Sequence, residues 1–242
     1  MTDATDALFL DSLRADRSAI AALAATDLSA AVAACPGWTL ADLLRHVGAV
    51  QRWATAAMTV PPDVRPQFPH AEVGDDAVFT WFDDGMGALI AAFHDHDLDK
   101  PCWTFIGAES RRWWLRRQAL EAAVHRWDAE STAGLVPRPI EGDLAVTGVD
   151  EWCELESIRW FSPSPDLDAS FHLHATDGDG EWLVEARPAG FSWSRGHQKG
   201  DVAVRGSRSD LFLAVWHRIG ADDLEVFGDP TLWRSLLAAT AV

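Results

Sequence analysis

The stretch LEAAVHRWDAE, residues 120–130, carries a carboxylate at Glu121 and an imidazole at His125 within a run of strong helix formers. Residues four apart on an α-helix lie about 40° apart around the axis and about 6 Å apart along it, so these side chains project from one face. The pair could hold one metal ion. It could also form only an ordinary helix-face interaction, because Arg117, four residues before Glu121, could pair with the same carboxylate. The spacing alone leaves both interpretations open.

The surrounding sequence predicts a helical N-terminal region. Ser110 is a plausible N-cap and Gly134 a plausible C′ residue, which together predict a long helix that ends near residue 132. Thr39, with Asp42 three residues later, has the pattern of a capping box at the start of another helix. Four long helices joined by loops predict an up-and-down bundle. The other two helices are expected over residues 3–25 and 76–94, and the loops over residues 59–70 and 95–107.

The composition changes after a further predicted helix, residues 143–160, and the segment FSPSPDLD, residues 161–168, which has the composition of a linker. Short β-prone runs separated by glycine-containing turns predict strands, with two helices among them. The expected fold class is α+β, with a helical bundle over residues 1–155 and a small α/β domain over residues 156–242 that covers the site. The predicted strands lie within residues 171–176, 181–186, 191–195, 201–206 and 224–228, and the two helices span residues 209–219 and 230–240.

The bulk properties narrow the range of partners. A formal net charge of −17 over 242 residues argues against nucleic acid and anionic membrane surfaces. The acidic N-terminal segment does not resemble a secretory signal, and no apolar run is long enough to span a bilayer, so a cytoplasmic protein is expected. Abundant alanine and an excess of arginine over lysine favour a high-GC bacterial source. The sequence has no signature of oligomeric state.

The cysteines are scattered and form no C-x-x-C motif, which favours reduced thiols in a cytoplasm. None of Cys35, Cys102 and Cys153 has a histidine close in sequence, so a cysteine nucleophile is not favoured. The chain has 13 tryptophans and no tyrosine, and the tryptophans are expected to pack in the core rather than to form a stacking platform.

A metal held by Glu121 and His125 would need a third ligand from a neighbouring helix, because catalytic zinc sites typically use three protein ligands and leave one position open. His46 is the natural candidate, since it lies three residues after Leu43 and four before Val50 and so faces the bundle interior. A hydrogen-bonded core histidine is the alternative. Two further pairs, His94 with His96 and His172 with His174, have no evident third ligand.

Several motifs resemble one known family. The segments CPGWTLADLLRHVG (35–48), LEAAVHRWDAE (120–130), GVDEW (148–152) and GDVAVRGSRSDLFLAVWHRI (200–219) are similar to the mycothiol-dependent maleylpyruvate isomerase family. That family belongs to the DinB-like four-helix metalloproteins, and the resemblance covers nearly the whole chain. It implies a DinB-like four-helix bundle followed by a small α/β domain. It also implies a divalent metal, usually zinc, held by His46, Glu121 and His125.

The resemblance further implies a thiol-dependent reaction on a small, anionic substrate. In this family an open metal position accepts the thiol of mycothiol, the low-molecular-weight thiol of actinobacteria, and the metal lowers the thiol pKa. The thiolate then adds to an activated cis double bond, the resulting single bond rotates, and elimination gives the trans isomer. The expected activity is therefore isomerisation or transfer, with mycothiol as cosubstrate.

Three residues are candidates for supporting roles. Arg117, in the basic run SRRWWLRR (110–117), lies one turn before Glu121 and could bind an anionic substrate or pair with acidic residues. Arg218 falls where the family motif carries an arginine near a helix end. Asp128, seven residues after Glu121, could orient a ligand histidine or be merely structural.

Two other functions remain open at this point. One is a metal-dependent hydrolase, in which the open position holds water whose pKa the metal lowers. The other is a non-enzymatic protein that binds a small ligand. Two histidines and a glutamate without a fourth protein ligand favour an open, catalytic site over a closed structural one.

Overall fold

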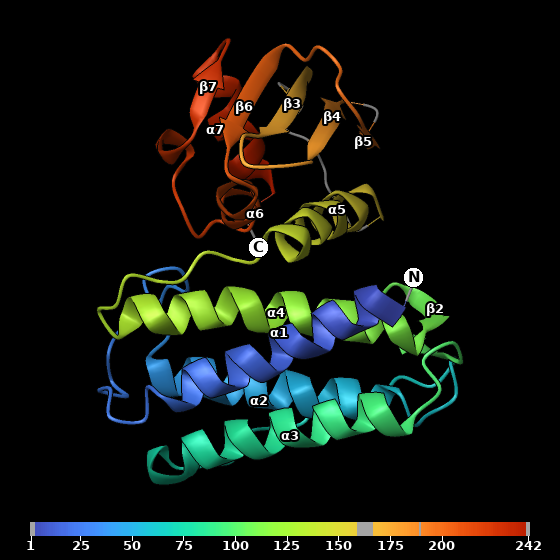
Figure 1. Cartoon of the computed structure of the whole chain (residues 1–242), viewed down its shortest axis with the longest axis vertical. Coiled ribbons are helices and arrows are strands. Elements are labelled where there is room, and N and C mark those ends of the chain that lie inside the picture. The colour runs from blue at the N-terminus through green and yellow to red at the C-terminus, as the bar shows by residue number, and fades with distance from the viewer. Residues whose placement is uncertain (1–2, 159–166, 189, 241–242) are drawn as a thin grey trace. The chain divides into compact units, whose positions relative to one another are not determined.

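The computed structural model describes residues 3–158, 167–188 and 190–240. The chain divides into two compact units, Met1–Arg138 and Pro139–Val242 (Figure 1). This boundary differs from the one expected near residue 155. The helix α5 (Gly142–Ile158) belongs to the second unit because it packs against α6 (Arg208–Val215) and β5 (Gly190–Arg195). The predicted end of that helix at residue 160, and most of the expected linker, lie outside the described residues.

The first unit is a four-helix bundle, as the sequence predicts. The helix α1 packs against α3 and α4, and α2 packs against the same two helices. The helices α1 and α2 therefore occupy diagonal positions, joined by residues 22–39. The four helices are α1 (Asp3–Ala21), α2 (Leu40–Ala57), α3 (Val78–Asp95) and α4 (Arg111–Thr132).

The directions of the helices differ from the expected up-and-down order. An ion pair joins Arg112 to Asp6 near the start of both α4 and α1. Another joins Arg126 to Asp16 near the end of both helices, so α1 and α4 run parallel. Figure 1 shows the same relation for α2 and α3, whose colours advance in the same direction. The up-and-down prediction is wrong because residues 58–77 return along the bundle before α3 begins.

The start of α2 has the capping box that its sequence predicts. The hydroxyl of Thr39 accepts a hydrogen bond from the backbone N–H of Asp42 at 3.2 Å, and the Asp42 carboxylate accepts one from the backbone N–H of Thr39 at 3.0 Å. These bonds satisfy N–H groups that a helix start would otherwise leave without partners.

Thr39→Ala is expected to lower the free energy of unfolding of the first unit by about 1 kcal/mol, since the cap hydroxyl is lost. Urea denaturation measures the change. The control is Thr59→Ala, which removes a hydroxyl bonded only to the carbonyl of Ala56 and should cost under about 0.5 kcal/mol. Equal effects of the two substitutions would contradict the capping role.

A hairpin connects α3 to α4, where the sequence predicts only a loop. Its strands β1 (Pro101–Thr104) and β2 (Gly107–Ser110) pair antiparallel. The Trp103 ring lies 5.2 Å from the Trp53 ring and 6.4 Å from the Trp114 ring, measured between centroids. The indole N–H of Trp114 also donates to the backbone carbonyl of Trp103 at 2.8 Å. Tertiary contacts between tryptophans thus hold this short hairpin against α2 and α4.

The second unit contains a five-stranded sheet in the order β5-β4-β3-β6-β7. The strands β3 and β6 are parallel and the other neighbours are antiparallel. The predicted strands and the two predicted helices are all present, which confirms the α+β class. The remaining elements are β3 (Ala169–Ala175), β4 (Glu181–Arg187), β6 (Val202–Gly206), β7 (Glu225–Phe227) and α7 (Pro230–Ala239).

Helices cover one face of this sheet. On that face the Phe171 ring of β3 lies 6.4 Å from the Trp233 ring of α7. The Phe191 ring of β5 lies 5.5 Å from the Trp152 ring of α5. The largest fully buried side chains of the protein include four tryptophans, three of which belong to this unit. Their burial supports the expected role of tryptophan in the core. Because side chains alternate along a strand, His172 and His174 of β3 project from the opposite face.

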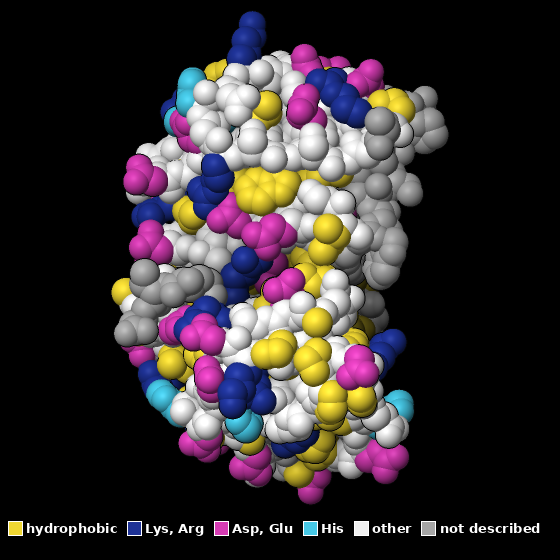
Figure 2. All heavy atoms as spheres, turned by 90° about the vertical axis from the view of Figure 1, so that its right-hand side faces the viewer, with side chains coloured by type: hydrophobic (Ala, Val, Ile, Leu, Met, Phe, Trp, Pro, Cys, Tyr) yellow, Lys and Arg dark blue, Asp and Glu magenta, His cyan; other side chains and the backbone are white. Residues whose placement is uncertain are grey.

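None of the helices in the described ranges is both long and apolar enough to cross a membrane. Figure 2 shows one face of the molecule, on which the described basic side chains stand mainly among acidic ones. This mixture fits the ion pairs that join separate elements, such as Arg17 of α1 with Asp83 of α3 at 2.6 Å.

Candidate metal centre

The structure brings His46 of α2 together with Glu121 and His125 of α4. The Nε2 atom of His46 lies 3.3 Å from Oε1 of Glu121, and Nε2 of His125 lies 3.2 Å from the same oxygen. One ligand atom from each residue lies within 4.8 Å of the other two. The His46 side chain therefore faces the bundle interior, as its position between Leu43 and Val50 predicts.

These three residues fit a divalent metal. Zinc bonds to imidazole nitrogen and carboxylate oxygen at about 2.0–2.2 Å, so neighbouring ligand atoms of a tetrahedral site are about 3.4 Å apart. The separations of 3.2 and 3.3 Å agree with that spacing. Among the residues that the structure describes, no fourth side chain joins this group of three. Two imidazoles and one carboxylate form the donor set of open, catalytic zinc sites.

Asp128 contacts the far side of the His125 ring. Its Oδ2 atom lies 3.0 Å from Nδ1 of His125, and its side chain is fully buried. A carboxylate on one ring nitrogen fixes the tautomer and the ring orientation, which leaves the other nitrogen directed at Glu121. This position suits the orienting role predicted for Asp128.

The electrostatics of the cluster favour a cation. Burial acts to raise the pKa of Glu121, but Arg117 and His125 outweigh it and hold that pKa well below its ordinary value of 4.5. Burial acts to lower the pKa of His125, but Glu121 and Asp128 raise it to about 8. Two carboxylate side chains, Glu121 and Asp128, thus flank the ring of His125 on either side.

Trp38 packs against His46, one of the three residues of the cluster. Their ring centroids are 4.8 Å apart with an angle of 52° between the planes. Gly37 has a φ of +86°, a conformation that suits glycine, and so lets the chain turn Trp38 toward the histidine. The Pro-Gly-Trp segment thus has a physical role that spacing did not reveal.

Comparison with known proteins agrees with this geometry. Residues 9–130 match the family model of the mycothiol maleylpyruvate isomerase N-terminal domain, and residues 143–235 match the model of the C-terminal domain of the same enzymes. The chain belongs to the mycothiol-dependent maleylpyruvate isomerase family. It is thus an enzyme of the maleylpyruvate isomerase type, with mycothiol as the thiol cosubstrate.

Two solved structures share the fold of this maleylpyruvate isomerase family member. The crystal structure of a mycothiol-dependent maleylpyruvate isomerase matches with a TM-score of 0.66 and 16% identity, over 93% of this chain and 95% of that one. A histidine-to-alanine mutant of a mycothiol-dependent maleylpyruvate isomerase matches with a TM-score of 0.63 and 16% identity over the same shares. A search of curated proteins found no match.

Cys35 lies near the candidate metal centre of this family member, which sequence reasoning missed. One potential ligand atom from each of Cys35, His125 and Asp128 lies within 4.8 Å of the other two. The cysteine is far from His125 along the chain, and only the path of residues 22–39 brings them together, so no local pattern could reveal the contact.

The other two cysteines are buried. Burial raises the pKa of the Cys102 thiol to about 11 and that of Cys153 well above its ordinary value. Both thiols are therefore protonated at neutral pH, and all three cysteines of the chain lie outside disulfides. These observations fit structural thiols at Cys102 and Cys153.

The two arginines considered for substrate binding lie in different units of the chain. The guanidinium of Arg117 hydrogen-bonds Oε2 of Glu121, which is the helix-face pair considered as the alternative to substrate binding. Arg218 belongs to the second unit. It follows α6 in a turn where His217 has a φ of +63° and the Arg218 N–H donates to the carbonyl of Leu213 at 2.8 Å. Its role toward substrate stays a prediction.

Of the two other histidine pairs, only the pair on β3 belongs to a group of potential metal ligands in the described part of the chain. His94 contacts the guanidinium of Arg14 at 2.7 Å, and within the described ranges neither His94 nor His96 joins a group of three potential ligands. The expectation that nothing completes the pair on β3 is wrong, because a glutamate and a third histidine join His172 and His174.

Proposed function

We propose that this protein is a metal-dependent isomerase or transferase that uses mycothiol on a small anionic substrate. His46, Glu121 and His125 are the proposed ligands of a divalent metal, with zinc favoured by the donor set. The observation that carries the proposal is the approach of two imidazole Nε2 atoms, from two helices, to a single oxygen of Glu121.

A divalent metal in this position would lower the pKa of the mycothiol thiol, so that the thiolate is available at neutral pH. The protein's own residues prepare the site. The two histidines fix its location between α2 and α4, and Asp128 holds His125 in the tautomer that presents Nε2. The positive charge of Arg117, whose guanidinium hydrogen-bonds the second carboxylate oxygen, helps to keep Glu121 ionised.

The proposed roles of the supporting residues follow from these contacts. Asp128 is a positioning residue, since it acts through His125. Arg117 is proposed to act on Glu121, and Arg218 is the remaining proposed cation for the substrate carboxylate. Maleylpyruvate is the first substrate to assay because the family is defined by that reaction.

Asp128→Asn is expected to weaken zinc binding at the bundle site by about 10–100-fold, the usual effect of losing a charged partner of a ligand histidine. Competition with a chromophoric chelator measures the affinity. Excess zinc should restore activity, which a merely structural defect would not allow. Asp95→Asn, at the exposed end of α3, is the matched control. Wild-type zinc affinity in the Asp128 variant would contradict the positioning role.

Elemental analysis, followed by thermal unfolding with and without mycothiol, tests the proposal as a whole. We expect bound metal and a stabilisation of about 2.7 kcal/mol when mycothiol is present at 100 times its Kd. Maleylpyruvate isomerisation should require both the metal and the thiol. Metal with no response to mycothiol would instead favour a hydrolase. Absence of metal, without recovery on adding zinc, would favour a non-enzymatic binding protein.

A further inference from the structure

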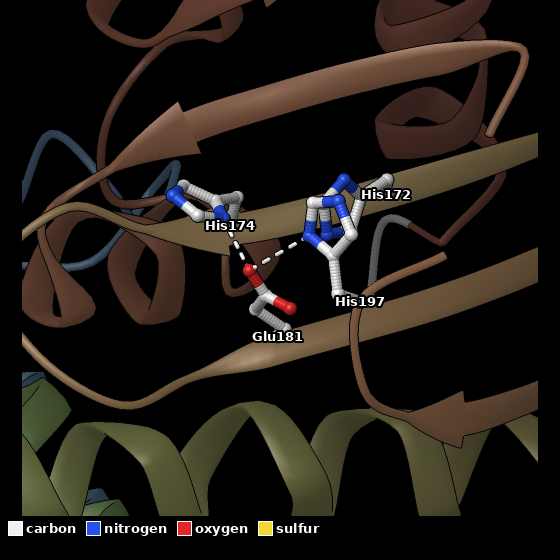
Figure 3. Close-up of side chains that lie close together, drawn as sticks. All are labelled: His172, His174, Glu181 and His197. Atoms are coloured by element: carbon white, nitrogen blue, oxygen red, sulfur yellow. Dashed lines mark hydrogen bonds and ion pairs between the residues drawn. The ribbon is translucent and has the colours of Figure 1, made fainter. Parts of the chain in front are cut away.

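A second group of potential metal ligands lies in the second unit, on the face of the sheet opposite the one that the helices cover. His172 and His174 are two residues apart on β3 and share a face. Glu181 of β4 is the direct partner of His174 in the strand register. Figure 3 shows these side chains gathered with His197, which follows β5. Neither the family match nor the proposed function assigns a role to this group.

The loop after β5 is held in a way that fixes His197 beside the strands. The N–H of Gly196 donates to the carbonyl of Glu181 at 3.0 Å, which continues the β4–β5 pairing by one residue. Gly196 has a φ of +117°, so the chain can turn there toward β3. The amide of Gln198 donates to the hydroxyl of Ser194 at 2.9 Å and restrains the loop further.

The far end of the loop is also attached to β3. A side chain at Gly200 would place its Cβ 2.8 Å from the backbone nitrogen of His172, so the backbone approaches the strand closely there. The Asp201 carboxylate accepts a hydrogen bond from the N–H of Ser170 at 2.8 Å. Both ends of the loop are therefore anchored, and His197 is positioned before any ligand binds.

The donor atoms are close enough for one ion. One nitrogen from each histidine and one oxygen of Glu181 all lie within 4.8 Å of one another. The Nδ1 atoms of His174 and His197 lie 2.6 and 3.0 Å from Oε1 of Glu181. The rings of His172 and His197 stand at 89° with centroids 4.9 Å apart. Small side-chain rotations would bring the atoms to the spacing of about 3.4 Å in a tetrahedral zinc site.

Hydrogen bonding to Glu181 alone does not account for all three histidines. The carboxylate bonds two of the imidazoles, but Nε2 of His172 is buried and has no hydrogen-bond partner among the described residues. A buried polar atom without a partner destabilises the folded state, because it loses its hydrogen bonds to water and gains none in the protein. The side chain is only 7% exposed, so solvent offers little compensation. A cation shared by the four residues would give the His172 ring a role.

We propose that His172, His174, Glu181 and His197 form a second divalent-metal site, which binds Zn²⁺ or a similar first-row transition metal. Three imidazoles and one carboxylate supply four protein ligands, the number found in closed structural sites. The bound metal ties the loop of residues 196–201 to β3 and β4. Entry is open, because the His197 side chain is 76% exposed and a pocket of about 310 Å³ adjoins His174 and Glu181.

The test counts zinc in the full-length protein, titrated from the metal-free form. The wild type should bind two equivalents. His197→Ala should bind one. Losing a direct ligand should lower the zinc affinity of the second site by more than about 100-fold, which exceeds the loss caused by removing a residue that only contacts a ligand. This variant suits the test since His197 lies on an exposed loop and its loss should leave the sheet folded. His197→Cys should retain the second equivalent, as thiolate is also a zinc ligand.

Controls separate this site from the bundle site. His125→Ala should lose the first equivalent and keep the second, whereas His70→Ala, an exposed histidine of the first unit, should keep both. In the His125→Ala background, zinc should increase the hydrogen-exchange protection of residues 196–201. The inference is overturned if His197→Ala binds as much zinc as the wild type, or if His125→Ala binds none. Either result leaves the proposed function intact.

Discussion

His125→Ala is expected to remove the metal from the bundle site and to lower kcat/KM for mycothiol-dependent isomerisation by about 10³-fold. A bound metal contributes several kcal/mol of charge stabilisation, and each 1.36 kcal/mol corresponds to a factor of ten in rate. His125 supplies one of the three donor atoms and is the ligand that Asp128 orients. The loss of His125 therefore removes a metal ligand and also leaves Asp128 without the ring that it orients.

The cysteines provide the controls for this experiment. Cys102→Ala should leave metal content and activity unchanged, because the buried thiol, with a pKa of about 11, is protonated at neutral pH. Cys35→Ala is the more demanding control, since Cys35 lies close to His125 and Asp128. It too should retain activity if mycothiol supplies the reacting sulfur. Full turnover by the His125 variant would refute the assignment of the ligands.

Arg126→Met is expected to lower the free energy of unfolding of the first unit by about 3–5 kcal/mol at pH 8, the usual effect of breaking a buried ion pair. Arg126 is 3% exposed and binds three groups. Its guanidinium contacts Asp16 at 3.2 Å and Glu130 at 2.6 Å, and it donates to the carbonyl of Arg138 at 2.6 Å. Without Arg126, two buried carboxylates lose their shared cation.

The effect should be smaller at pH 5. Burial raises the pKa of Asp16 from 3.8 to about 6, even against the attraction of Arg126. A carboxyl whose folded pKa is raised contributes stability that is complete below pH 3.8 and is lost as the pH rises through 6. In the variant the pKa of Asp16 loses the lowering effect of Arg126, so a proton neutralises Asp16 readily at pH 5, whereas protonating it at pH 8 costs more free energy. Urea unfolding at the two pH values measures this, with exposed Arg14→Met as the control. A loss under about 1 kcal/mol at pH 8 would contradict the role of Arg126.

Local signals explain which parts of the fold were predictable. The start of α2 follows from Thr39 and Asp42, whose capping box involves only residues three apart. The strands of the second unit follow from alternation and glycine-containing turns. The β1–β2 hairpin depends on contacts between Trp103, Trp53 and Trp114, which are distant in sequence. The relative directions of the helices depend on the path of residues 58–77. This segment has no periodic pattern from which its path could be predicted.

In the candidate sites too, local spacing made some residues predictable, whereas others depend on contacts distant in sequence. Glu121 and His125 share a helix, so their spacing predicted a common face, and the phase of His46 predicted its inward direction. The proximity of Cys35 and of His197 to their clusters depends on loops, and neither loop carries a local signal. The extent of the second unit was also unpredictable, because α5 is an ordinary amphipathic helix whose partners lie later in the chain.

The central claim is that three side chains of the bundle hold one metal whose remaining position accepts the sulfur of mycothiol. X-ray absorption at the zinc edge tests it most directly in the His197→Ala protein, where only the bundle site should be loaded. We predict nitrogen and oxygen ligands alone before mycothiol is added, and one new sulfur ligand at about 2.3 Å afterwards. A spectrum that mycothiol leaves unchanged, or a sulfur ligand already present without it, would contradict the claim.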